Sequence, residues 1–349
     1  MQEAVVHEVL SQKGVIMALT INTNLSSLIV QSNLNKSTGA LNQAIERMTT
    51  GYKINHASDN AAGYSIARNW ETQLGSLDIA ADNAATGADM LSTIEDTYSL
   101  ISSHMQRVRD LTEQAANGTY GVDSLQAIES EIKARLEEVN RIAANCEFNG
   151  KHLMDGTTGA LNIQVGLYSN ADSRISLDAS LFTNAKIGGL FKAYASTTAS
   201  GGKTLSEIVK AANNGTAITV NDSAFTTDAQ LHAFAAACAG LVYNSSTGAF
   251  TKETAAGCGP EQMLDFIDKA MAALSTKTTT LGAAQNRIDS AIESIAVQSE
   301  NITSSLSTLR DADIAKESSN YIQSQILQQA AATLLATANQ TPSIALNLL

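Results

Sequence analysis

The sequence predicts a mainly α-helical protein: a long antiparallel coiled-coil rod of paired N- and C-terminal regions, with a small β or mixed insert at its tip. Three observations support this fold class: a seven-residue apolar repeat in the C-terminal half, apolar helical stripes in the N-terminal half, and a Gly-, Thr-, Ser- and Ala-rich stretch between them. The chain has 349 residues, of which aromatics make up only 5%. Ala, Ile and Leu carry most of the apolar content, which favours long helices in thin bundles over a thick globular core.

The C-terminal half contains the clearest periodicity. Apolar residues recur at consecutive seven-residue steps, which is typical of a coiled-coil seam. Pro260 precedes the repeat, where a proline suits the first helical turn. A helix of this length would extend roughly 70 Å, which is too long for an ordinary compact domain. The repeat consists of Ile267, Leu274, Leu281, Ile288, Ile295, Ile302 and Leu309.

The N-terminal half offers two helices as partners for the long helix. The first has an apolar stripe with alternating steps of three and four residues, and it stops at the turn pair Asn117-Gly118. The second has its apolar residues on one face and ends near Asn149-Gly150. The stripes are Leu91, Ile94, Tyr98, Ile101, Met105, Val108, Thr112 and Ala115, then Leu125, Ile128, Ile132, Leu136, Val139 and Ile142.

The segment between these helices and Pro260 changes in character. Residues 161–182 have the pattern of short strands and turns, and residues 195–258 are rich in Gly, Thr, Ser and Ala. Within the latter, "TAITV" (216–220) predicts a strand and "DAQLHAFAAACAGLV" (228–242) predicts a short helix. Helices flank the segment on both sides, so we expect an insertion at the tip of a hairpin-like rod.

Both ends of the chain are apolar at helical spacing. Two helices alone bury too little area to be firmly stable. We therefore expect the ends to become ordered by packing into an assembly. The residues expected to pack there are Leu34, Leu41, Met48, Ile322, Ile326 and Leu334.

Charge and reactive side chains exclude several classes of function. The formal net charge is -12, whereas binding to nucleic acid or to an anionic membrane needs a basic footprint, and no apolar run reaches transmembrane length. The His residues lack ligand spacing, no P-loop or GxGxxG occurs, and we expect no catalytic, cofactor or metal site. The cysteines, Cys146, Cys238 and Cys258, are interpreted as free thiols, with a Cys238–Cys258 bridge as the alternative.

Several long motifs at both ends resemble bacterial flagellins. They are "MALTINTNLSSLIVQSNLNKS", "AIERMTTGYKINHASDNAAGYSIA", "QRVRDLTEQAANGT", "FNG" followed by "NIQVG", and "QSQILQQAAATLLATANQTPSIALNLL". The resemblance covers about 17–180 and 260–349. It implies a subunit that polymerises into the flagellar filament, is exported by the flagellar type III apparatus, and is secreted and extracellular. It also implies partners: further copies of the chain, an export chaperone, the filament cap, hook-junction proteins and the host Toll-like flagellin receptor.

The resemblance also divides the chain into regions. Residues 1–16 precede the family's start, and we expect translation to begin at Met17, which would make this extension an annotation artefact. The filament-core helical domain would comprise 17–60 and 310–349. The rod domain would comprise 61–190 and the long helix 260–309, and a variable surface-exposed insert would occupy 191–259.

Two groups of residues match sites known in the family. The patch sensed by the Toll-like receptor maps onto Arg107, Leu111 and Glu131, and we expect Leu111 to be exposed because it lies off the apolar stripe. The C-terminal leucines read by cytosolic sensors map onto Leu346, Leu348 and Leu349, although the usual closing Arg is absent. Two alternatives remain open: a hook–filament junction protein, and a secreted adhesin or immune ligand that acts through the insert.

Overall fold

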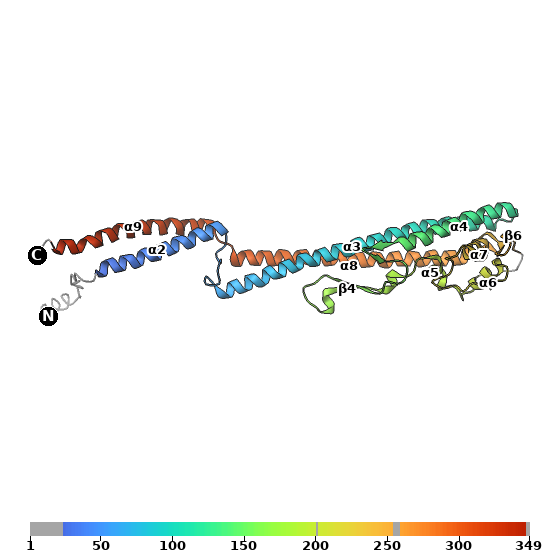
Figure 1. Cartoon of the computed structure of the whole chain (residues 1–349), viewed down its shortest axis with the longest axis horizontal. Helices are drawn as coiled ribbons and strands as arrows, with labels where there is room; N and C mark the ends of the chain where they lie inside the picture. Colours follow the sequence, from blue (N-terminus) through green and yellow to red (C-terminus); the bar gives the residue numbers. More distant parts are fainter. Residues whose placement is uncertain (1–23, 200–201, 254–258, 347–349) are drawn as a thin grey trace, which may run out of the picture. The chain divides into compact units, whose positions relative to one another are not determined.

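The computed structural model describes residues 24–199, 202–253 and 259–346. These fall into two compact units. The terminal unit is the described part of Met1–Thr72 together with that of Asn301–Leu349, and the central unit is Gln73–Glu300. The fold class predicted from the sequence is confirmed, because long helices pair the N- and C-terminal regions and the sheets are small (Figure 1).

The terminal unit is built around two helices, α2 (Leu25–Thr50) and α9 (Ile314–Leu346), which lie side by side (Figure 1). The side chain of Asn24 caps α2 by accepting a hydrogen bond from the Ser27 amide at 3.0 Å. Gly51 ends α2 in the left-handed conformation with φ of 76°, which glycine adopts without a steric penalty.

A small junction joins the two chain segments where α2 ends and α9 is about to begin. Tyr52 and Asp311 form an isolated antiparallel bridge, and the Lys53 amide donates to the Arg310 carbonyl at 2.7 Å. The Arg310 guanidinium lies 4.1 Å from the centroid of the Tyr52 ring. Backbone and cation–π contacts therefore hold the two connecting segments together.

The central unit contains α4 (Val122–Asn145) and most of two longer helices, α3 (Ala61–Ala116) and α8 (Pro260–Arg310). Arg109 of α3 pairs with Asp268 of α8 at 2.6 Å, and Arg107 of α3 pairs with Glu131 of α4 at 2.9 Å. The predicted helices are confirmed, and α3 begins about 30 residues earlier than the stripe that predicted it. The first five positions of the seven-residue repeat, Ile267 to Ile295, are at most 5% exposed.

Two small hairpins follow α4. The first pairs β1 (Glu147–Phe148) with β2 (Lys151–His152) around Asn149-Gly150, whose φ values of 48° and 78° suit a two-residue type I′ turn. The second pairs β3 (Leu161–Gln164) with β4 (Arg174–Leu177), so that Leu161 faces Leu177 and Gln164 faces Arg174. The prediction of short strands in 161–182 is confirmed. Two single-turn 3-10 helices complete the region, η1 (Ala171–Ser173) and η2 (Ala179–Phe182).

The described part of the insert contains α6 (Leu205–Ala212), α7 (Asp228–Ala239) and a hairpin of β5 (Leu241–Asn244) and β6 (Ala249–Lys252), and α5 (Ile187–Lys192) leads into it. Phe191, Phe225 and Phe234 are all fully buried, with ring centroids 4.8–4.9 Å apart. The predicted helix is confirmed as α7, while Leu241 and Val242 belong to β5. The strand predicted at 216–220 is wrong: this segment has no partner strand, although Ile218 and Val220 are buried.

The insert packs against the helices of the central unit. Helix α7 lies on α4, and the buried residues of both belong to one hydrophobic cluster (Figure 1). The side-chain amide of Asn140 on α4 makes two hydrogen bonds to this region. Its Nδ2 donates to the Phe225 carbonyl at 2.8 Å, and its Oδ1 accepts from the Ile187 amide at 3.0 Å. These two part-buried hydrogen bonds hold the insert in a fixed position on α4.

Candidate assembly surface

The seam between α2 and α9 is narrow and is lined mainly by small or polar side chains. Ala44 of α2 and Ala331 of α9 are 3% and 8% exposed. Three larger apolar residues of α2 at this seam, Leu34, Leu41 and Met48, are only half-buried. Small residues let the two helix backbones approach closely, but they bury little apolar area.

Polar side chains set the register of this seam. The Asn24 Nδ2 donates to the Ala338 carbonyl at 2.7 Å, and the Gln328 Nε2 donates to Thr38 Oγ1 at 3.2 Å. Near the other end of the pair, Arg47 Nη1 lies 3.4 Å from Glu317 Oε1. The start of α2 thus contacts the later part of α9, and the end of α2 contacts the start of α9. The two helices are therefore antiparallel.

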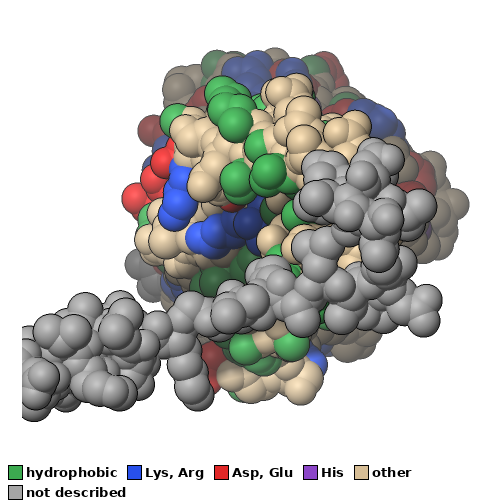
Figure 2. Space-filling model, turned by 90° about the vertical axis from the view of Figure 1, so that its left-hand side faces the viewer, with side chains coloured by type: hydrophobic (Ala, Val, Ile, Leu, Met, Phe, Trp, Pro, Cys, Tyr) green, Lys and Arg blue, Asp and Glu red, His purple; other side chains and the backbone are tan. Residues whose placement is uncertain are grey.

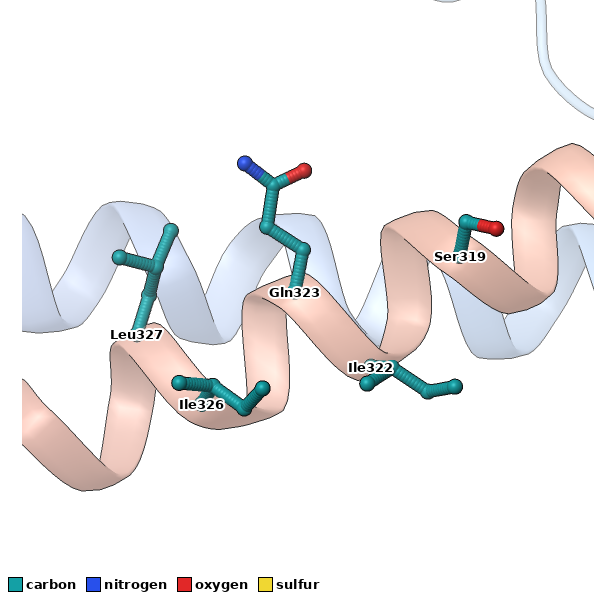
Figure 3. Close-up of a pocket in the computed structure, with 5 residues that line it drawn as sticks. All are labelled: Ser319, Ile322, Gln323, Ile326 and Leu327. Carbon is teal, nitrogen blue, oxygen red and sulfur yellow. The ribbon is translucent and has the colours of Figure 1, made fainter.

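The outer face of α9 presents large apolar side chains to solvent. Ile322 and Ile326 are 51% and 59% exposed, and they project together from one side of α9 (Figure 3). With Ser319, Gln323 and Leu327 they line an open hollow on this helix. The half-exposed or more exposed large apolar residues of α9 are Ile314, Ile322, Ile326, Leu327 and Leu334.

Large apolar residues lie on several sides of α9. Leu335 is half-buried beside α2, whereas Ile326, nine residues earlier, lies about 180° from it around the helix. Leu327 and Leu334 occupy a flank between these two directions. A helix face with large apolar residues is normally buried against another element. In this chain α2 covers only one of these sides.

Helix α2 carries a second exposed apolar patch. Leu25, Leu28 and Ile29 are 58%, 63% and 48% exposed. Leu28 and Ile29 line a shallow groove with polar neighbours, among them Gln31 and Lys36. Figure 2 views the molecule from the end where Figure 1 draws α2 and α9, and hydrophobic side chains lie open at the surface among polar ones. We call the exposed apolar residues of α2 and α9 the assembly surface.

The six packing residues predicted from the sequence divide into two sets. Leu34, Leu41 and Met48 face the seam with α9 and are half-buried, whereas Ile322, Ile326 and Leu334 are exposed. They therefore do not form one cluster within the chain. The apolar pattern did not single out Ile29 and Ile314, which are 48% and 49% exposed, or Arg47 with Glu317, which join the helices.

The predicted receptor patch is only partly exposed. Arg107 and Glu131 pair across α3 and α4 at 2.9 Å, and Arg135 lies 3.7 Å from the same carboxylate oxygen. The expectation that Leu111 is exposed is wrong, because its exposed fraction is 2%. The residue lies off the stripe that predicted α3, but the buried face of that helix is wider than the stripe. Of the C-terminal leucines, Leu348 and Leu349 lie outside the described residues, and for Leu346 only its position at the end of α9 is described.

Several titratable side chains are buried in the central unit. Burial raises the pKa of the Cys238 thiol to about 12, and Cys146 is likewise a buried free thiol whose pKa is raised by burial. Burial also raises the pKa of Glu129, against the lowering effect of its hydrogen bond to His232. Cys258 and residues 1–16 lie outside the described part of the chain.

Reactive side chains do not gather into a centre within the described residues. Across 24–199, 202–253 and 259–346, no group of three or more His, Cys, Asp or Glu side chains is placed to hold a metal ion. In the same part of the chain, no helix is long and apolar enough to cross a membrane. The surface feature that stands out in this part of the chain is thus the apolar one on α2 and α9.

Two protein-family models match the chain. The bacterial flagellin N-terminal helical region matches residues 21–158, and the bacterial flagellin C-terminal helical region matches residues 264–349. Among curated proteins, polar flagellin F of Vibrio parahaemolyticus is 31% identical and flagellin A of Vibrio anguillarum is 32% identical. Each alignment covers 95% of this chain and 100% of the relative. A crystal structure of Bacillus cereus flagellin is similar at 20% identity with a TM-score of 0.37, covering 64% of this chain and 94% of that one.

The matched regions contain the helices that form the assembly surface, and they define a structural protein whose copies assemble with one another. The chain belongs to the bacterial flagellin family. It is a structural subunit of the flagellar filament and not an enzyme.

Proposed function

We propose that the assembly surface on α2 and α9 is the contact through which copies of this chain polymerise into the filament. One observation carries the proposal: α9 has large apolar residues on several sides, yet α2 covers only one of them. Burying one such Leu or Ile side chain contributes about 1.5–3 kcal/mol. A filament also needs a heterologous contact that does not close, and two different helix faces on one chain supply it.

The same surface bears on how the chain reaches the filament. We propose export through the flagellar type III apparatus to the outside of the cell, with an export chaperone, hook-junction proteins and the filament cap as successive partners. Helices with so little internal burial unfold at low cost and can remain unassembled until captured. These partners would meet the apolar faces before a second copy of the chain does.

A host Toll-like flagellin receptor is a further proposed partner. Arg107 and Glu131 offer exposed charge, with side-chain exposures of 47% and 37%. Since Leu111 is buried, we assign it a supporting role beneath this pair. The proposed tail site at Leu346, Leu348 and Leu349 remains an expectation from the family resemblance.

The assembly proposal can be tested with surface variants of the full chain. The double variant Ile322→Asn/Ile326→Asn removes two exposed apolar side chains from α9. We expect its monomer to keep its helicity, because neither residue is buried, while seeded growth of filaments fails in negative-stain electron microscopy. Leu100→Asn is a matched control, since Leu100 is a helical leucine of the central unit with 48% exposure.

The outcomes separate the alternatives. Normal filaments from the double variant would refute the assembly surface. A wild-type chain that adds one layer to seeds and stops would favour a hook–filament junction protein. An adhesin or immune ligand acting through the insert predicts that removing 191–259 abolishes function while filaments still form.

A further inference from the structure

A buried acid–base pair joins the insert to α4. Glu129 of α4 has a side chain only 1% exposed, and its Oε1 lies 2.8 Å from Nδ1 of His232 on α7. The other carboxylate oxygen, Oε2, is buried without a hydrogen-bond partner. Along α4, Glu129 interrupts the apolar stripe between Leu125 and Ile132, which places a carboxyl group where the helix otherwise buries hydrocarbon.

Charged groups on the two helices surround this pair. On α7, Asp228 lies 3.7 Å from Nε2 of His232 and also pairs with Lys133 of α4. Lys133 in turn lies 3.3 Å from Glu137, one turn further along α4. The carboxylates of Glu129, Asp228 and Glu137 thus lie around the ammonium group of Lys133. His232 is the other basic side chain of this cluster.

The remaining neighbours contribute no opposing charge. His232 stacks on Tyr243 of β5 at 4.7 Å between ring centroids and meets Phe250 of β6 edge-on at 5.9 Å. Below the pair, the fully buried Thr112 of α3 bonds with the thiol of Cys238 on α7. The aromatic rings and the buried thiol shield the pair from water and hold the imidazole plane in place.

We propose that Glu129 and His232 form a pH-sensitive latch. The pair holds α7 and the β5–β6 hairpin on α4 while it retains one proton between its two members. It releases them as the pH rises and that proton is lost. The second attachment, Asn140 with Phe225 and Ile187, contains no titrating group and stays closed, so release is confined to the α7 side of the insert.

The sign of the effect follows from burial. A docked Glu129 takes up a proton more readily than a solvated one, because burial raises its pKa. Such a group stabilises docking at low pH, and that contribution is lost as the pH rises through the docked-state pKa. Once the pair has lost its proton, His232 faces a buried carboxylate whose Oε2 has no donor. Release lets water solvate both oxygens.

The latch can be read by hydrogen exchange on the full chain. Between about pH 5.5 and 8.5, protection of the α7 amides, corrected for the intrinsic exchange rate, should fall about tenfold. Amides of α3 and α8 should keep their protection. If α7 loses no protection over this range, or loses it only together with α3, the latch does not exist.

Two variants at the pair and one matched control make the test specific. In Glu129→Gln the side chain keeps its shape and an acceptor oxygen but cannot ionise, so protection of α7 should become flat with pH. His232→Gln removes the hydrogen bond that lowers the pKa of Glu129 but leaves Glu129 buried and ionisable, so the fall in α7 protection should persist and move to higher pH; this variant serves as the test if the first one folds poorly. Glu138→Gln changes a glutamate of the same helix whose side chain is 35% exposed and whose partner is Arg141, and it should retain the wild-type profile. A wild-type slope in Glu129→Gln would overturn the proposal.

Discussion

The terminal and central units use the same kind of element, long helices in pairs, but they bury very different amounts of side chain. In the central unit the seam residues Ile267, Leu281 and Ile288 are fully buried. In the terminal unit the buried hydrophobic residues, among those described, are Ala44, Ile54, Ala67 and Ala331. Large apolar side chains are present in both units, but those of α2 and α9 point largely outwards.

The difference shows what each unit needs for stability. Helical stability in proteins comes mainly from packing of the apolar face and less from intrinsic propensity. The central unit completes that packing with α3, α4, α8 and the insert, whereas α2 and α9 have only each other. We infer that the central unit is stable in the monomer and that the terminal unit gains most of its stability on assembly.

The largest expected effect is in the core of the insert. Phe234→Ala removes a fully buried ring that contacts Phe191 and Phe225 at 4.9 and 4.8 Å between centroids. The loss of transfer free energy and the resulting cavity should lower the free energy of unfolding by about 3–5 kcal/mol. Chemical denaturation of the monomer, followed by circular dichroism, measures this change. A loss below about 1 kcal/mol would mean that the insert core is loosely packed and that the contrast between the units is smaller than described.

A smaller effect is expected where α2 and α9 are held by a polar contact. Arg47→Ala removes the cation beside Glu317, a residue that is 7% exposed. The Glu317 carboxylate then retains a hydrogen bond from the side-chain amide of Asn320 at 3.3 Å. Leaving this carboxylate without its cation should cost about 1–3 kcal/mol. Since the α2–α9 pair has little else to hold it, exchange of the α9 amides should become faster while that of the α8 amides within the central unit stays unchanged.

Arg68→Ala is the control for that experiment. Arg68 pairs with Glu71 at 2.9 Å on the surface, and its side chain is 64% exposed, so we expect little change in α9 exchange. If Arg47→Ala also leaves α9 unaffected, the polar register contacts do not hold the pair, and the half-buried Leu34, Leu41 and Met48 must suffice.

Regular repeats made much of the central unit predictable. The seven-residue repeat of α8 and the one-sided stripe of α4 each report burial directly, because helical periodicity places those residues on one face. Leu111 was misjudged because α3 buries a face wider than its stripe, and no single helix shows the width of that face in its own sequence. The segment 216–220 has the composition of a strand but lacks a partner strand, which composition cannot reveal.

The candidate sites were predictable only in part. Apolar residues at both ends indicated an assembly surface, but which of them face the seam depends on the register that Asn24 and Arg47 set. The contact of Glu129 with His232 joins residues 103 positions apart and could not be predicted from local sequence. One signal was present: a glutamate within the apolar stripe of α4 needs a polar partner from another element.

The smallest expected effect on the monomer gives the sharpest test of the comparison. Leu334→Ala truncates a side chain that is 57% exposed on α9, so the free energy of unfolding of the monomer should change by no more than about 0.5 kcal/mol. In the filament the lost leucine would have been buried, at about 1.5–3 kcal/mol per subunit. Because 1.4 kcal/mol corresponds to a factor of about ten in an equilibrium constant, the critical concentration for polymerisation should rise at least about tenfold. Sedimentation of filaments at graded protein concentrations measures it. An unchanged critical concentration would place Leu334 outside the contacts between subunits, and a clearly destabilised monomer would mean that the terminal unit already buries this side chain on its own.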